Sequence, residues 1–210
     1  MKGVFIALSG MIGVGKSTLS AALAEVLHLP LYKEPVDDNV YLADFYTDKA
    51  KHGFAMQVYL LNRRFQLQQQ IIWGNSGGIL DRTTEEDKIF AKMLCDGKFM
   101  DERDHNTYLS LCQHMSNFLK APNLIIHLDV SPEKALERIR NRNRTCESGI
   151  TIEYLRALHA GYQEFLKDMS RRVPVIMIDY ETFSSVDSVI EAIVREYRTA
   201  FKLRVVHPVS

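Results

Sequence analysis

The stretch Gly10-Met-Ile-Gly-Val-Gly-Lys-Ser17 matches the pattern G-x-x-x-x-G-K-[ST] in full. In such a loop the backbone N–H groups close around phosphate oxygens, and glycines are needed because Cβ atoms would obstruct that approach. Lys16 adds a charge for the β- and γ-phosphates, Ser17 a hydroxyl for Mg²⁺, and the next helix a positive dipole end. The apolar run Val4–Leu8 predicts a buried strand before the loop, which is the context that a phosphate-binding loop requires. We expect the phosphates of ATP to be bound by Gly10, Gly13, Val14, Gly15, Lys16, Ser17 and Thr18.

Strands and helices alternate along the rest of the chain. Short apolar runs at Leu29–Tyr32, Ile79-Leu80, Leu124–Leu128 and Val175–Ile178 are typical of buried strands. Helices are predicted at about Thr18–Leu27, Gly53–Trp73, Glu85–Asp96, His105–Lys120, Thr151–Met169 and Val186–Phe201, and from Pro132 onward. Strands joined by helical crossovers form a parallel sheet with helices on both faces. With 210 residues and no repeat or linker, we expect one α/β domain over 1–210.

Composition excludes several classes of protein. The 26 basic residues balance the 26 acidic ones, which argues against binding to duplex DNA or to an anionic membrane. Three cysteines without a Cys-x-x-Cys spacing predict neither a disulfide framework nor a zinc site and favour a reducing compartment. No apolar run reaches the roughly 18 residues of a membrane helix. We therefore expect a cytoplasmic protein with no nucleic-acid or membrane partner.

Charged residues follow two of the predicted strands. Glu34 comes after the strand at Leu29–Tyr32, and Asp81-Arg82 follows Ile79-Leu80. Ligands bind outside the carboxyl ends of parallel strands, so these side chains should reach the phosphate loop. A carboxylate there suits a neutral nucleoside acceptor, whose hydroxyl must lose a proton, and would repel the phosphate of a monophosphate.

In this interpretation Asp81 holds Mg²⁺, through water, and Arg82 neutralises charge on the transferred phosphoryl group. A structural alternative stays open on the residues alone. Glu34 would then cap a helix, and Asp81 would pair with Arg82.

One helix face has the residue types that could read a nucleobase. Gln57 and Arg64 are seven residues apart, hence within about 20° of each other on a helix, with Leu60 between them. Asp87 lies on a face continued by Phe90, so its carboxylate should point inward and need a partner, for which Arg64 is the candidate. The alternative is a solvated polar face, because the same helix carries four nearby glutamines. These are Gln66, Gln68, Gln69 and Gln70.

Arginines alternate over one short segment as Arg138, Arg140, Arg142 and Arg144. Steps of two residues place Arg138 and Arg142 on the helix face opposite Arg140 and Arg144. Four cations at the end of a helix suit a lid at about 138–149 that closes on a triphosphate, with Arg140, Arg142 and Arg144 toward the phosphates. The alternative is a simple exposed basic helix end.

The phosphate loop alone does not decide the reaction. No Asn-Lys-x-Asp guanine motif follows it, which disfavours a GTPase. Besides a nucleoside kinase, two alternatives are a nucleoside monophosphate kinase of the thymidylate kinase type and a non-catalytic nucleotide-binding subunit. The acidic positions and the arginine run argue against the second, because binding alone does not require them.

Taken together, these positions resemble the deoxynucleoside kinase family, from the phosphate loop to about Tyr180. The segments that carry the resemblance are Glu34-Pro35-Val36, Asp44-Phe45-Tyr46, Gln57, Asp81-Arg82-Thr83, Asp87 with Ile89-Phe90-Ala91, Arg103-Asp104 with Tyr108, and the lid from Arg138 to Glu147. The resemblance implies a P-loop kinase with a five-stranded parallel sheet in the order 2-3-1-4-5. It also implies a homodimer and transfer of the γ-phosphate of ATP–Mg²⁺ to the 5′-hydroxyl of a deoxyribonucleoside.

The resemblance also implies roles for single residues. Glu34 is the base for the 5′-hydroxyl, although the acidic Asp81 is given that role in some descriptions of the family. Tyr46 and Glu147 hold the 3′-hydroxyl, and Gln57 pairs with the base edge. Arg64 with Asp87 matches relatives that accept dA, dG or dC and reject dT, and Arg82, Arg142 and Arg144 gather around the transferred phosphate.

The chain departs from the animal members of the family at two positions. Asn39 and Gly53 stand where those members often have tryptophan. Both changes remove aromatic walls, so they bear on base preference rather than on the type of reaction. The chain is closer to the short bacterial or plant-like branch.

Overall fold

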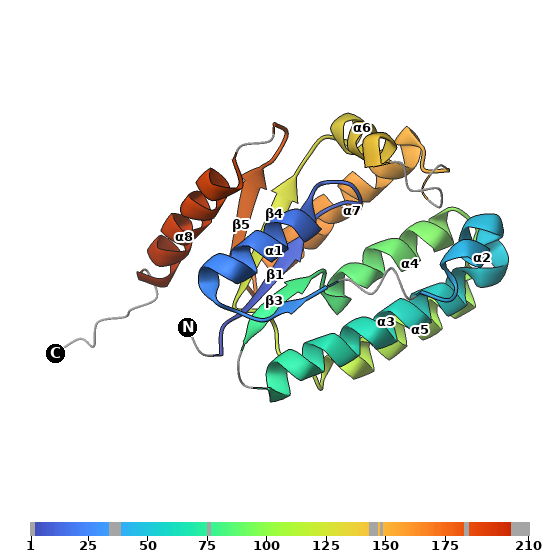
Figure 1. Cartoon of the computed structure of the whole chain (residues 1–210). Helices are drawn as coiled ribbons and strands as arrows, with labels where there is room; N and C mark the ends of the chain where they lie inside the picture. Colours follow the sequence, from blue (N-terminus) through green and yellow to red (C-terminus); the bar gives the residue numbers. More distant parts are fainter. Residues whose placement is uncertain are drawn as a thin grey trace.

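The computed structural model of the chain describes residues 3–33, 39–74, 77–142, 147, 149–182 and 185–202, with side chains described up to Tyr197. In these residues a five-stranded parallel sheet has the order β2-β3-β1-β4-β5 (Figure 1). Its strands are β1 (Phe5–Ser9), β2 (Leu31–Tyr32), β3 (Gly78–Asp81), β4 (Leu124–Asp129) and β5 (Val175–Asp179). The expected α/β fold and strand order are confirmed.

Helices pack on both faces of this sheet (Figure 1). They are α1 (Lys16–Leu27), α2 (Leu42–Thr47), α3 (Lys49–Trp73), α4 (Asp87–Asp96), α5 (Glu102–Ser116), α6 (Pro132–Arg142), α7 (Ile152–Met169) and α8 (Val186–Lys202), with a 3₁₀ turn, η1 (Thr84–Glu86), before α4. Among the described residues, no helix is both long enough and apolar enough to span a membrane.

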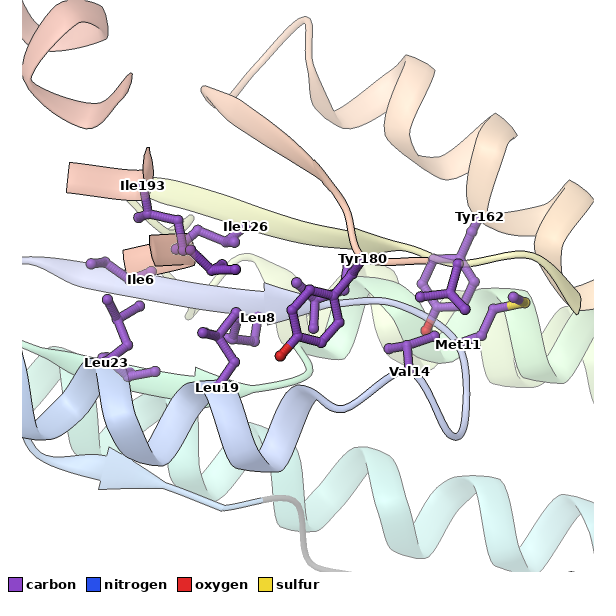
Figure 2. Packing of buried hydrophobic residues seen from close by; sticks show 14 of the residues in the cluster. Ile6, Leu8, Met11, Val14, Leu19, Leu23, Ile126, Tyr162, Tyr180 and Ile193 are labelled. Carbon is purple, nitrogen blue, oxygen red and sulfur yellow. The ribbon is translucent and has the colours of Figure 1, made fainter. Parts of the chain in front are cut away.

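Alternate residues of β1 face opposite layers of helices. Ile6 and Leu8 lie in a buried cluster with side chains of α1 and α8 (Figure 2). Phe5 and Ala7 lie in a second cluster, with side chains of α3 and α7. Both faces of the sheet are therefore covered, which explains why its central strands are continuously apolar instead of alternating.

Helices α3 and α5 begin four and three residues earlier than the sequence pattern predicted. Helix α3 begins at Lys49 because the side chain of Asp48 accepts a hydrogen bond from the backbone N–H of Lys51 at 3.0 Å. Helix α5 begins at Glu102, where Asp101 caps the helix in the same way. The predicted starts at Gly53 and His105 were wrong because they followed the apolar stripe and overlooked the aspartate caps.

The phosphate loop is packed tightly against α6. Gly13 has a φ of +84°, and a Cβ there would lie 2.6 Å from Cγ1 of Ile139 and 2.9 Å from the carbonyl oxygen of Ala135. A side chain does not fit, because the carbonyl belongs to the helix backbone. Arg138 also donates from Nη1 to the carbonyl oxygen of Val14 at 3.1 Å. The first turns of α6 therefore pack directly against the phosphate loop.

Candidate active site

A cavity of about 800 Å³ opens where the phosphate loop meets α3, α4, α6 and α7. It lies at the carboxyl ends of the strands, where ligands of open α/β sheets bind. The sequence-predicted residues that line it are Gly13, Gly15, Lys16, Ser17, Thr18, Tyr46, Gln57, Arg64, Arg82, Arg142 and Glu147. The structure thus brings a phosphate-binding loop and the proposed base-reading helix to one space.

The phosphate end of the cavity is formed by the start of α1. Gly15 has a φ of +104° and lets the chain turn from the loop into the helix. The buried ammonium of Lys16 donates to the carbonyl oxygens of Gly10 and Met11, each at 2.9 Å. The positive end of the helix and the lysine therefore meet at one point, which suits the binding of phosphate oxygens.

A hydroxyl and a carboxylate that could both bind a metal ion lie together beside this loop. Ser17 donates from Oγ to Oδ2 of Asp81 at 2.8 Å, although the two residues are 64 positions apart in the sequence. A hydroxyl and one carboxylate fit Mg²⁺, which is held in nucleotide sites by one or two protein oxygens together with phosphates and water. This contact holds an Asp81 carboxylate oxygen at the first turn of α1, directly after the phosphate-loop lysine.

Arg82 lies at the junction between β3 and the cavity. Its φ is +74°, and its backbone N–H donates to the carbonyl oxygen of Leu8 on β1. The guanidinium lies over the ring of Phe90, with 4.7 Å from Cζ to the ring centroid, and donates to the carbonyl oxygen of Gly10 at 3.3 Å. A cation at the phosphate loop can stabilise charge on a transferred phosphoryl group.

The opposite end of the cavity is formed by one face of α3. Gln57, Leu60 and Arg64 all line it, as their spacing on a helix predicted. Arg64 forms an ion pair with Asp87 of α4, and the two side chains are 3% and 0% exposed. The predicted pairing is confirmed. Two opposite charges held this far from water stabilise each other and give the wall of the cavity a fixed pattern of donors and acceptors.

Helix α6 presents its arginines on opposite faces. Arg138 and Arg142 line the cavity, whereas Arg140 is exposed and lies outside the lining residues. Arg142 contacts both carboxylate oxygens of Glu147, at 2.6 and 2.7 Å. The placement of Arg140 at the phosphates therefore stays a prediction.

Several sequence-predicted positions are elsewhere. Glu34 and Arg144 lie outside the described residues. Gly10, Val14, Asp81 and Asp87 are not among the lining residues, and they contact lining residues instead. Their expected contacts with ligand stay predictions.

Sequence reasoning missed other side chains that line the cavity. They are Lys49, Phe99 and Tyr154 among others, whereas Arg138 and Phe90 were singled out in the sequence without a contact to ligand being assigned to them. Lys49 lies 5.7 Å from the ring centroid of Phe99 and 5.9 Å from that of Tyr154. The cap at Asp48 was the available signal for Lys49, because a helix that begins there places Lys49 two turns before the lining residue Met56, on the same face.

A buried histidine lies beneath the phosphate loop. His127 on β4 is 3.2 Å, through Nδ1, from Oγ of Ser9, and its ring packs beside that of Tyr162. Burial lowers the pKa of His127 to about 4, and the nearby Lys16 lowers it as well, whereas Asp129 acts in the opposite direction. The imidazole is therefore neutral in the folded protein at neutral pH.

This depressed pKa makes folding stability depend on pH. Between about pH 6.5 and pH 4 the unfolded chain binds a proton at His127 that the folded chain does not, so stability rises with pH in this window. We expect this residue to make the free energy of unfolding about 3 kcal/mol larger at pH 7 than at pH 4. Urea unfolding from pH 4 to 7 measures the slope. His127→Asn should flatten it, and equal slopes in both proteins would contradict the assignment.

Comparisons with known proteins agree on one family. The family model described as deoxynucleoside kinase matches residues 6–202. The chain is 52% identical to the deoxyadenosine kinase of Dictyostelium discoideum over 99% of its length and 85% of that protein. It is 34% identical to the deoxyadenosine/deoxycytidine kinase of Bacillus subtilis, over 90% of this chain and 89% of the other.

Solved structures extend the likeness to three dimensions. The deoxyadenosine kinase of M. mycoides, determined with dCMP and dCDP, superposes with a TM-score of 0.83 at 35% identity, over 93% of this chain and all of that one. The same enzyme has also been determined with dATP bound, and that structure gives the same TM-score and coverage. The family model, these relatives and the solved structures agree, and the chain belongs to the deoxynucleoside kinase family.

Proposed function

We propose that this kinase transfers the γ-phosphate of ATP to the 5′-hydroxyl of deoxyadenosine, with dG and dC as weaker acceptors and dT rejected. One observation supports the assignment above all. A single cavity runs from Lys16 and Ser17 to the buried pair of Arg64 and Asp87, so a phosphate donor and a base can be held on one line. The 52% identical relative is a deoxyadenosine kinase, which favours adenine among the possible bases.

The chemistry assigned to the acceptor end follows from the family pattern. Glu34 is the general base that takes the 5′-hydroxyl proton, and the contact between Ser17 and Asp81 supports giving Asp81 the metal position instead. Tyr46 and Glu147, which both line the cavity, hold the 3′-hydroxyl. Gln57 pairs with the base edge. A neutral alcohol beside a carboxylate is thereby oriented toward the donor phosphate.

The donor end is assigned to the phosphate loop and the arginines. Ser17 and Asp81 would hold Mg²⁺, which when bound shields charge on the β- and γ-phosphates. Arg82 and Arg142 bind the transferred group from two sides, and Arg144 joins them. The segment 138–149 covers the phosphates as a lid on the single domain 1–210, an assignment supported by the lining positions of Arg138, Arg142 and Glu147.

We also infer that the enzyme is a cytoplasmic homodimer. Large apolar side chains are exposed near the ends of the neighbouring helices α3 and α5, with Trp73 73% and Phe118 70% exposed. An exposed apolar area of this kind is typical of a subunit interface. Cysteine spacing and balanced charge support the cytoplasmic location.

A coupled assay of ADP release tests the proposed function. The purified protein with ATP and Mg²⁺ is offered the four deoxynucleosides, adenosine and dTMP in separate reactions. We expect the highest kcat/KM with deoxyadenosine and little ADP release with thymidine or dTMP. Turnover of dTMP without turnover of any nucleoside would overturn the acceptor assignment in favour of a monophosphate kinase. If no acceptor leads to ADP release, the result would favour a non-catalytic nucleotide-binding subunit.

A further inference from the structure

Behind the cavity, Arg82 is tied to a buried hydroxyl and through it to a buried carboxylate. Nη1 of Arg82 donates to Oη of Tyr162 at 2.7 Å, and this hydroxyl donates to Oε2 of Glu86 at 2.9 Å. Arg82 is 2% exposed, and Tyr162 and Glu86 are fully buried. The three side chains form a continuous polar chain, and its central member Tyr162 lies in the apolar cluster near Met11 of the phosphate loop (Figure 2).

The far end of this chain is fixed by the backbone. Oε1 of Glu86 accepts a hydrogen bond from the backbone N–H of Thr83 at 3.1 Å, and together they form the capping box of the turn η1. Glu86 therefore uses one carboxylate oxygen to hold the turn directly after Arg82 and the other to hold Tyr162. Such a carboxylate is a rigid reference point, because both of its oxygens are engaged.

Tyr162 reaches this point because α7 approaches α4 closely. A Cβ at Gly161 would lie 2.6 Å from Cγ2 of Ile89, so a larger residue there would push the two helices apart. The tyrosine ring is held on its sides by aromatic neighbours, at 5.5 Å from His127 and 6.2 Å from Phe165 between ring centroids. The position of its hydroxyl is thus set by packing and not by a flexible stem.

This arrangement has a consequence for charge at the phosphate loop. An arginine has a long side chain with many rotamers, and one that stabilises a transition state must be held in place beforehand. A direct ion pair with Glu86 would fix Arg82 but would also neutralise it. The neutral hydroxyl of Tyr162 lies between the two groups and fixes the guanidinium by a hydrogen bond. The carboxylate of Glu86 is thereby kept farther from the guanidinium, and because Coulomb attraction falls with distance, Arg82 keeps more of its charge for the phosphate.

We propose that Tyr162 and Glu86 are positioning residues that hold Arg82 toward the transferred phosphoryl group. The proposal rests on the function proposed above and assigns to both residues an effect on phosphoryl transfer that acts through Arg82. Neither residue lines the cavity, so neither is expected to contact the nucleoside.

The first test removes the central hydroxyl. Tyr162→Phe keeps the ring and its packing, and we expect kcat to fall about tenfold because a hydrogen bond to a charged group is lost. KM for deoxyadenosine should change less than about twofold, since the acceptor site is intact. Tyr197→Phe, which removes the hydroxyl of a half-buried tyrosine on α8, is the matched control and should keep wild-type kcat. Equal kcat in wild type and Tyr162→Phe would overturn the proposal.

A double-mutant cycle separates positioning from a general loss of structure. In the Arg82→Lys background, adding Tyr162→Phe should lower kcat less than about twofold, because the group that the hydroxyl positions has been replaced. An undiminished tenfold loss in that background would show that Tyr162 acts independently of Arg82 and would overturn the proposal. Glu86→Gln provides a second route, and we expect it to lower kcat in the wild-type background and not in the lysine background.

Failure of the proposed function can be distinguished from failure of the positioning role of Tyr162 and Glu86. If the wild-type protein releases no ADP with any acceptor, the proposed function fails. The same cycle is then measured as the affinity for a non-hydrolysable ATP analogue by calorimetry. A loss of affinity in Tyr162→Phe that disappears in the lysine background supports the positioning role, and unchanged affinity would overturn it.

Discussion

Glu34→Gln is expected to lower kcat by about 10²–10⁴, the usual contribution of a general base. Glutamine has nearly the same size as glutamate but cannot accept the proton of the 5′-hydroxyl. Binding of deoxyadenosine should be largely kept, because the amide still fills the site. Steady-state kinetics and calorimetric binding measure the two effects separately.

A matched control for this substitution is Glu25→Gln, which changes an exposed glutamate of α1. It should leave kcat unchanged. Wild-type turnover in Glu34→Gln would remove Glu34 from the mechanism, and the base role would then fall to Asp81.

The buried ion pair of Arg64 and Asp87 should give the largest effect on stability. Asp87→Asn removes the carboxylate charge of this pair from beside a guanidinium that is only 3% exposed. Breaking a buried pair in this way costs about 3–5 kcal/mol, measured as a loss in the free energy of unfolding in urea. The exposed pair of Lys92 and Asp96 is the control, and Asp96→Asn should change stability by less than about 1 kcal/mol. Similar losses for both variants would contradict this expectation.

The same pair should also determine which base is accepted. Replacing both Arg64 and Asp87 by apolar residues removes the two charges together and avoids an unpaired one. The ranking of the four deoxynucleosides by kcat/KM should then change, because the wall of the cavity loses its pattern of donors and acceptors. An unchanged ranking would make the pair structural.

The central part of the fold could be predicted from the sequence because its signals are local. The apolar run before the phosphate loop and the loop itself identify β1, the turn and the start of α1 without reference to anything distant. Helix α2 was not predicted, because Leu42–Thr47 is short and has no buried residue among its members. Its amphipathic stripe is too brief to show a helical period.

The cavity wall formed by α3 and its pair with α4 could also be predicted from the sequence. Gln57 and Arg64 are related by helix periodicity alone, and a buried aspartate requires a cation, so Arg64 with Asp87 could be paired before any coordinates were known. The contact between Arg82 and its tyrosine partner could not be predicted in this way. Tyr162 lies on the apolar stripe of α7 and is indistinguishable in sequence from a core residue, because its partners are 76 and 80 positions away.

The packing around Gly13 restricts how this sequence can change during evolution. The phosphate-loop pattern leaves its position free, so a search by pattern would accept alanine there. The close approach of Ile139 and of the Ala135 carbonyl does not accept it. Trimming the isoleucine alone would not relieve the clash with the helix backbone. A substitution at position 13 would therefore require a shift of the whole of α6. We expect this position to change more slowly during evolution than the sequence pattern suggests.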